Sequence, residues 1–531
     1  MKSAATWLAA VLVLFPTRIA LATDFQANPS NYVSMLSVLQ PGDTLHLDPG
    51  SYTNQLNLTN LNGSPNGWIT IAGPSGGSPA VFLGNACCNT IEIRNSSYVT
   101  VRAITSDAQH IPGVFGVSAN GGTSNLVHDI EIDGCTFLNH DGSQQTDGIS
   151  TKTPTWGWII HNNVMIQPGT GLYLGNSDGS SPFVAGMIEN NLVKNPIGYC
   201  MEIKYQAAWP TAFGLPIAPS STIIRNNVFI KGDGPSPDGD RPNLLVGGFP
   251  STGPGSLNRY EIYGNFFDHN PRESLLQVSG RVTIHDNVFV DTAVNAIVAR
   301  DHDLPLLQAY IYNNTIYAAA TGIGFGNAAP QGDAVVGNVI FSANPISGPI
   351  SDLRDNVTDA VSNAAQYVAA PSLTLGQMNF YPLPGECQGT ALNMTKFVAD
   401  LDYDLDFNGT SKGAFAFRGA YAGQGSNPGW TLDAAIKPAR AANPPPDAGT
   451  DGGNQADGGA DGGRPADAGI SADGGNPDSV DAGFNSIAAS TGCGCGSSSG
   501  TSAISVVLLA LLACLRPCRR FLRRTRRFIR S

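Results

Sequence analysis

A phrase of six or seven residues that recurs along the middle of the chain constrains the fold more than any other feature. Each copy has apolar residues on both sides of an Asn, and the Asn usually follows another Asn, an Asp or a Gly. The copies are residues 159–165, 187–193, 223–229, 261–267, 283–289, 310–316 and 335–340. Their shared residues are Asn163, Asn191, Asn227, Asn265, Asn287, Asn314 and Asn338, separated by 28, 36, 38, 22, 27 and 24 residues. A constant phrase at variable intervals indicates a solenoid whose loops differ in length.

Each phrase predicts two short β-strands joined by a bend at the Asn, which is the arrangement that one coil of a parallel β-helix requires. Asn tolerates the left-handed backbone conformation of such a bend. Because coils stack about 4.8 Å apart, the seven Asn side chains should lie above one another and exchange amide hydrogen bonds. We therefore interpret this Asn ladder as structural. Cys135, which stands 28 residues before Asn163, occupies the same position in the preceding coil and should be a buried thiol.

The two ends of the repeat predict caps, because a stack of coils must cover its edges. Residues 31–39 predict an amphipathic helix within an N-terminal cap of about residues 31–60, and residues 390–430 predict a closing segment. The order of phrases at 41–47, 68–71 and 98–101 resembles the entry into right-handed β-helices of the pectate-lyase-like superfamily, which includes the chondroitinase B and alginate lyase family. Residues 404–409 and 418–421 are similar to the closing phrase of many secreted β-helix proteins. The resemblance covers about residues 40–425 and implies an all-β, single-stranded, right-handed parallel β-helix of about ten coils.

Both termini have the composition of targeting segments. Residues 1–22 have one Lys, an apolar stretch and a small-x-small site, as in a signal peptide, and an uncleaved anchor is the alternative. The folded domain is then residues 23–430, followed by an acidic Asp/Ala/Gly-rich linker at 431–491 that cannot form a core.

The last segment, residues 492–531, contains Cys493 and Cys495, an apolar run and eight Arg residues. Its layout resembles the myxobacterial C-terminal sorting tag, which implies removal of the tail and attachment to the cell surface through one of these cysteines. An ordinary membrane tail anchor remains the alternative. We expect an exported protein of the cell surface or outer membrane, either retained there or released.

The charge distribution excludes one class of partner. The net charge is −12, and the Arg-rich tail offsets the acidic linker, so residues 1–443 carry about −13 by subtraction of the two segments. Nucleic acid is therefore not expected to bind the β-helix. We expect a monomer whose partner is a polysaccharide.

The candidate chemistry follows from the superfamily resemblance. It implies a lyase or epimerase that removes the proton next to the carboxylate of a uronic acid, with Ca²⁺ often neutralising that carboxylate. Period-two alternation places Lys152, Tyr173, Glu202, Lys204 and Arg300 on one solvent face of neighbouring strands. Lys204 is the predicted base, with Glu202 beside it as an orienting or metal-binding group and Arg300 as a second basic group. Lys152, Tyr173, Arg225, Arg241 and His302 are the predicted substrate-binding residues.

This resemblance weakens at the catalytic motif. The chondroitinase B and alginate lyase family carries Glu-x-Ile-Ser-x-Lys-Ser, and Glu202-Ile203-Lys204 is shorter. A Lys two residues from a Glu is also common on an ordinary exposed strand. The sequence therefore leaves three functions open: a lyase or epimerase of acidic glycans, a non-catalytic carbohydrate-binding or adhesive protein, and a purely structural surface protein.

Overall fold

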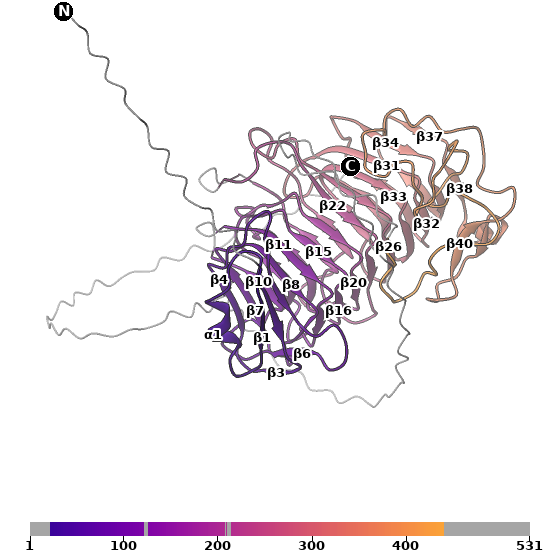
Figure 1. Ribbon diagram of the computed structural model, residues 1–531. Helices are drawn as coiled ribbons and strands as arrows, with labels where there is room; N and C mark the ends of the chain where they lie inside the picture. The colour runs from indigo at the N-terminus through magenta and orange to yellow at the C-terminus, as the bar shows by residue number, and fades with distance from the viewer. Residues whose placement is uncertain (1–21, 122–125, 208, 210–213, 440–531) are drawn as a thin grey trace, which may run out of the picture. The chain divides into compact units, whose positions relative to one another are not determined.

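The computed structural model describes residues 22–121, 126–207, 209 and 214–439 (Figure 1). The predicted signal peptide up to residue 21, most of the predicted linker, and Cys493 and Cys495 lie outside these residues. In the described residues almost every element is a β-strand, and the one α-helix is α1 (Tyr32–Leu36). None of the helices described there is long and apolar enough to cross a membrane.

Three parallel sheets make up the solenoid, and each coil contributes one strand to each sheet. Sheet A contains β1 (Asp24–Ala27), β2 (Thr44–Leu47), β5 (Ile69–Ala72), β8 (Ser97–Arg102), β11 (Val127–Asp133), β15 (Ile159–His161), β19 (Met187–Glu189), β22 (Ser221–Arg225), β25 (Arg259–Tyr263), β28 (Gly280–His285), β31 (Leu306–Tyr312), β34 (Asp333–Val336) and β37 (Leu353–Arg354), with β14 (Thr155–Trp156) and β18 (Phe183–Val184) at its side. Sheet B contains β3 (Gly50–Tyr52), β6 (Ala80–Leu83), β9 (Ile104–Asp107), β12 (Thr136–Leu138), β16 (Val164–Ile166), β20 (Leu192–Lys194), β23 (Val228–Ile230), β26 (Phe266–Asn270), β29 (Val288–Thr292), β32 (Thr315–Tyr317), β35 (Val339–Phe341) and β38 (Val357–Asp359).

Sheet C carries the candidate site and contains β4 (Leu56–Thr59), β7 (Ile91–Arg94), β10 (Val117–Ala119), β13 (Asp147–Thr151), β17 (Thr170–Leu174), β21 (Met201–Ile203), β24 (Leu244–Val246), β27 (Leu276–Val278), β30 (Asn295–Ala299), β33 (Thr321–Phe325) and β36 (Asn344–Ser347). Figure 1 shows strands of successive coils side by side, from indigo near α1 to orange near β38. The eleven strands of sheet C correspond to eleven complete coils, one more than the ten or so predicted. The predicted parallel β-helix is confirmed.

Columns of identical or similar apolar residues fill the interior, since parallel register places equivalent residues directly above one another. In sheet C the inward column is fully buried and consists of Ile149, Leu172, Met201, Leu244, Leu276, Ile297 and Ile323. Outward positions between these columns are free to carry polar side chains, and this alternation creates the candidate site.

The bends between sheets A and B contain the Asn residues of the repeated phrase, all fully buried. Asn191 shows the pattern: its Oδ1 accepts hydrogen bonds from the backbone N (3.1 Å) and Nδ2 (2.9 Å) of Asn163, and its Nδ2 donates to Asn227 Oδ1 (2.9 Å). The same bonds continue through Asn338 to Asn356, an eighth member that the repeat analysis did not identify. The left-handed residue is the one before each ladder Asn, such as Asn162 (φ 56°) and Gly264 (φ 66°). The ladder Asn therefore supplies the hydrogen bonds, and its predecessor makes the bend.

The two ends of the β-helix are covered differently. Near the N-terminus, Tyr32 of α1 is buried against Tyr52 and Phe82. Near the C-terminus, the chain after β38 forms a 3-10 helix, η3 (Val361–Gln366), and an antiparallel hairpin of β39 (Val368–Ala370) and β40 (Asn379–Pro382), and then returns along the solenoid.

The closing segment extends beyond the predicted boundary at residue 430. Leu432 and Lys437 are 1% and 2% exposed. Lys437 Nζ donates hydrogen bonds to Phe407 O (2.6 Å) and Gly264 O (2.7 Å), and it lies 3.4 Å from the centre of the Phe407 ring. Residues 431–437 thus belong to the folded domain and not to the linker.

The five cysteines of the predicted domain divide into one disulfide and three free thiols. Cys87 and Cys88 form a disulfide between adjacent residues. Cys135, Cys200 and Cys387 are free and buried. Burial raises the pKa of the Cys135 thiol to about 12, which keeps it protonated beside the ladder.

Candidate functional site

Titratable side chains gather on the outward face of sheet C over β13, β17 and β21. We call Asp147, Lys152, Tyr173, Glu202 and Lys204 the central cluster. The register pairs Ser150 with Tyr173 and Tyr173 with Glu202, so these side chains form one outward column. Lys152 and Lys204 come two residues later in their coils, where their backbone N–H groups still bond to the neighbouring strands. Four of these residues were predicted to share this face, and the structure brings them together.

Lys204 and Glu202 form an ion pair within this cluster. Lys204 Nζ donates to Glu202 Oε1 at 3.0 Å, and the side chains are 14% and 3% exposed. Burial raises the pKa of Glu202, and the positive charge of Lys204 opposes that rise. An amine that is already hydrogen-bonded to a carboxylate suits an electrostatic role better than proton abstraction.

Lys152 has a different environment. Its Nζ lies 3.4 Å from the centre of the Tyr173 ring, and it does not form an ion pair with any of the carboxylates that the structure describes. Burial lowers the pKa of Lys152, although the nearby charges of Asp147 and Glu202 oppose this shift. A lysine with a lowered pKa is more often neutral at a given pH, as a general base must be. Lys152 was predicted only to bind substrate.

Asp147 and Tyr199 belong to the site but were not among the predicted residues. Burial raises the pKa of Asp147 to about 7, while the charge of Lys152 lowers it. Tyr199 lies just before β21, and burial together with the charge of Glu202 raises the pKa of its hydroxyl. Both residues stand at or before the first residue of a strand. There the period-two rule is least informative, because loops of unequal length precede each strand.

Of the other predicted basic residues on this side, Arg241 lies beside the central cluster, whereas Arg300 and His302 follow β30, three strands beyond β21, and do not join it. The Arg241 guanidinium lies 5.6 Å from the centre of the Tyr199 ring. Arg300 is exposed at the end of β30 and donates to Gln277 Oε1 (3.0 Å) in the coil before it. His302 lies in the loop after Arg300, 3.6 Å from Asp303, and bonds to none of the central cluster.

Arg225 is not part of this face, which corrects the expectation that it binds substrate there. It is the last residue of β22 in sheet A, and its Nε donates to Glu189 Oε2 at 2.6 Å. Its Nη1 also donates to Tyr263 Oη at 3.2 Å. Because sheets A and C are different walls of the solenoid, Arg225 stabilises the exterior of sheet A instead.

The central cluster does not fit a calcium site. Ca²⁺ takes six to eight oxygen ligands, whereas the cluster offers two carboxylates, one of them paired with Lys204 and the other with a pKa near 7. The group of possible metal ligands in the described residues is Glu131, Asp133 and His161 on sheet A. There the His161 ring bonds to Glu131 at 2.9 Å and Arg102 bonds to Asp133 at 2.7 Å, so cationic side chains already neutralise these acids.

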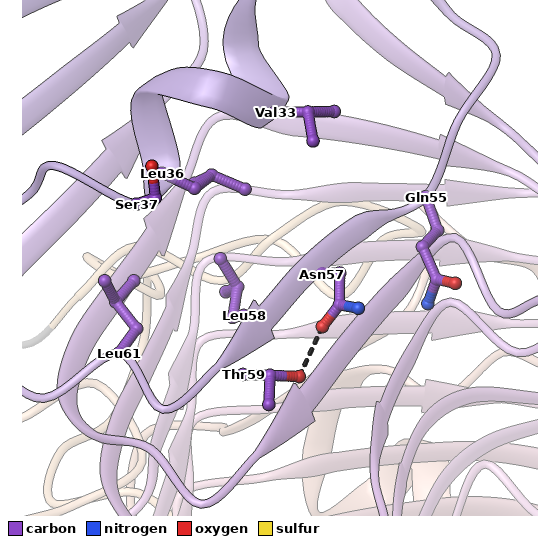
Figure 2. Close-up of a pocket in the computed structure, with 8 residues that line it drawn as sticks. All are labelled: Val33, Leu36, Ser37, Gln55, Asn57, Leu58, Thr59 and Leu61. Carbon is purple, nitrogen blue, oxygen red and sulfur yellow. Dashed lines mark hydrogen bonds between the residues drawn. The ribbon is translucent and has the colours of Figure 1, made fainter. Parts of the chain in front are cut away.

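A small recess between α1 and β4 has no comparable chemistry. Figure 2 shows its lining of Val33, Leu36, Ser37, Gln55, Asn57, Leu58, Thr59 and Leu61. Its volume is about 260 Å³, and no titratable side chain lines it. The recess belongs to the N-terminal cap and cannot supply acid–base catalysis.

No family model and no curated protein sequence matches this chain. Among solved structures, pectate lyase Pel9A is similar at 13% identity, with a TM-score of 0.42 over 79% of this chain and 98% of that one. The Azotobacter vinelandii mannuronan C-5 epimerase AlgE4 A-module is similar at 16% identity, with a TM-score of 0.39 over 61% and 92%. An alginate lyase from Paenibacillus sp. is similar at 16% identity, with a TM-score of 0.33 over 64% and 99%. The chemistry of this chain therefore rests on its own side chains.

Proposed function

We propose that this β-helix acts on an acidic polysaccharide at the central cluster, as a lyase or an epimerase. The observation that carries the proposal is the environment of Lys152, a half-buried amine that lies on the Tyr173 ring next to the ion-paired Lys204 and has a lowered pKa. A neutral amine beside fixed positive charge is the pair of groups that proton abstraction next to a carboxylate requires.

In this mechanism Lys152 Nζ takes the proton from the carbon adjacent to the uronate carboxylate. The electron pair moves onto the carboxylate, where the charge of Lys204 stabilises it. In a lyase the glycosidic C–O bond to the neighbouring carbon then breaks, and the leaving oxygen takes a proton from Tyr173. Burial raises the pKa of this hydroxyl, so it retains its proton for transfer. In an epimerase a water molecule instead gives a proton to the same carbon from the opposite face, and Lys152 returns its proton to the resulting hydroxide.

Lys152→Met tests this assignment, because Met is unbranched and similar in size to Lys but cannot accept a proton. We expect turnover of pectate, alginate or chondroitin to fall by about 100-fold or more. For the wild type, kcat should rise with pH and reach a plateau below the ordinary pKa of lysine. Unsaturated uronate is measured by ultraviolet absorbance, and epimerisation by proton NMR of the recovered polymer.

Lys204→Met is the matched variant, and it should reduce turnover without removing the rise of kcat with pH. Binding of a glycan by the wild type with neither elimination nor epimerisation would contradict catalysis. That result would establish the non-catalytic, carbohydrate-binding alternative.

We also propose that the chain is exported and held at the cell surface by its C-terminal segment. The support is the order of Cys493, Cys495, an apolar run and eight Arg residues after the acidic linker. Mass spectrometry of the mature protein from the producing cells should find a new N-terminus near Thr23 and a modified Cys493 or Cys495. Recovery of the unprocessed chain from the cytoplasm would refute export.

A further inference from the structure

A polar loop beside the central cluster runs from Lys231 to Pro242 between β23 and β24. We call residues 231–242 the strap. It carries Arg241 to the edge of sheet C at which Asp147 and Tyr199 lie. Arg241 donates to Asp240 O (3.1 Å) and to Asp238 O (3.0 Å), so its guanidinium is fixed to the tip of its own loop. The position of the tip therefore determines the position of Arg241.

Both ends of the strap are tied to the coils around it. Lys231, 6% exposed, donates through Nζ to Arg241 O at 2.8 Å. The His269 ring bonds to Asp233 at 2.9 Å, and Arg272 donates to Asp233 O at 2.8 Å. The hydrogen bond from His269 to Asp291 raises the pKa of His269 to about 9, so this ring is positively charged beside Asp233 at neutral pH.

The tip of the strap is held by one buried side chain from a distant part of the sequence. Gln144 is 2% exposed and precedes β13. Its Oε1 accepts from Asp238 N at 2.9 Å, and its Nε2 donates to Gly239 O at 2.9 Å. In sheet C, β17 and β21 lie between β13 and β24, so the strap crosses the ends of two strands to reach Gln144.

The tip of the strap requires a glycine at position 239. Its φ is +102°, in the region that favours glycine, and a Cβ there would lie 3.0 Å from Arg241 Nη1. A larger residue would therefore strain the tip and press on the guanidinium. The amide clamp of Gln144 and the conformation of Gly239 hold the tip in the same position.

We propose that Gln144 is a positioning residue that fixes the strap and thereby makes Arg241 a binding site for a carboxylate of the acidic glycan. This inference rests on the proposed function, because the strap would bind a second sugar unit of the same glycan, next to the unit that reacts at Lys152. An arginine suits this role since its guanidinium presents donors in the geometry of a carboxylate. The bonds to Asp238 and Asp240 hold the orientation of the Arg241 guanidinium, and its remaining donors bind the carboxylate in this proposal.

The experiment compares Gln144→Met and Arg241→Met with Gln109→Met in the full-length chain. Gln109 is a suitable control because its Nε2 also bonds to a loop carbonyl, Gly84 O at 3.0 Å, in coils that precede the central cluster. Pectate, alginate and chondroitin hexasaccharides are each titrated by calorimetry, beside the carboxyl-reduced form of any that binds. Hydrogen–deuterium exchange of peptides covering 231–242 reports on the strap itself.

We expect Gln144→Met and Arg241→Met each to weaken binding of the acidic hexasaccharide by at least about tenfold, the scale of one charge-assisted hydrogen bond. Binding of the carboxyl-reduced form should not change, and Gln109→Met should match the wild type. Gln144→Met should also accelerate exchange in 231–242, whereas Arg241→Met should raise KM more than it lowers kcat.

Two results in Gln144→Met would overturn the positioning role and leave the proposed function intact. One is unchanged hydrogen–deuterium exchange in 231–242, and the other is faster exchange there with unchanged affinity for the acidic hexasaccharide. If the wild type binds none of the three hexasaccharides, the proposed function fails together with the role of Arg241.

Discussion

Asp147 is the residue of the central cluster whose protonation changes close to neutral pH. Its pKa is about 7 in the folded protein, against an ordinary value of 3.8, because burial disfavours the charged form. The folded state therefore binds a proton more tightly than the unfolded state. The resulting stability is complete below pH 3.8 and is lost as the pH rises through about 7.

Asp147→Asn tests this linkage, since Asn is neutral at every pH and similar in shape. The free energy of unfolding of the wild type should fall between pH 4 and pH 8 relative to that of the variant, and should change little above this range. Urea denaturation at a series of pH values measures the difference. A constant difference between the two proteins would show that Asp147 keeps an ordinary pKa.

Individual site residues were predictable where strand alternation fixes the side-chain direction. Lys152, Tyr173, Glu202 and Lys204 follow from period two along strands whose inward columns are apolar. The division of labour between the two lysines was not predictable, because it depends on which ammonium lies near a carboxylate. Arg225 could have been excluded, since it stands two residues before the ladder residue Asn227, at the end of a strand of sheet A.

At the scale of the element, the Asn ladder is the feature that defines each bend between sheets A and B. Asn227 Nδ2 donates to Asn265 Oδ1 at 3.0 Å and to Ile188 O at 2.9 Å, and its own Oδ1 accepts from Asn191. All these atoms are buried, so removal of the amide leaves polar groups of two neighbouring coils without partners. Such groups cost about 1–3 kcal/mol each.

Asn227→Ala should therefore lower the free energy of unfolding by several kcal/mol, measured by chemical denaturation. Asn54→Ala is the control, because Asn54 is exposed and its change should stay within about 0.5 kcal/mol. Equal stabilities of the two variants would mean that the ladder contributes nothing beyond the apolar columns. The ladder was predictable because identical residues recur in similar phrases. Its eighth member, Asn356, stands in another copy of the phrase, only 18 residues after Asn338.

The loops show the limit of such prediction at this scale. The strap was recognisable in the sequence as a long Gly, Pro and Asp segment, but its path was not. The contact of its tip with Gln144 spans 94 residues at Asp238 and 95 at Gly239. A repeat analysis aligns equivalent positions of successive coils. It does not predict the path of a loop over the preceding coils.

At the scale of the whole molecule, the folded unit ends where its last buried side chains end. Residues after 430 were predicted to belong to the linker, but the packing of Leu432 and Lys437 shows that residues 431–437 complete the closing segment. Burial of one Leu side chain stabilises by about 1.5–3 kcal/mol. The Lys437 ammonium also donates hydrogen bonds to two carbonyl oxygens, Gly264 O and Phe407 O.

Two fragments, residues 22–439 and residues 22–430, test where the folded unit ends. Residues 22–439 retain every buried contact described above and should unfold at the same temperature as the chain that includes the linker and tail. Residues 22–430 lack Leu432 and Lys437, so their Tm should be lower by several degrees and limited proteolysis should cut them within the closing segment. Differential scanning calorimetry measures the Tm of both fragments and of the full chain. Equal Tm values for the two fragments would restore the boundary at residue 430. A lower Tm for 22–439 than for the full chain would show that residues beyond 439 contribute to the fold.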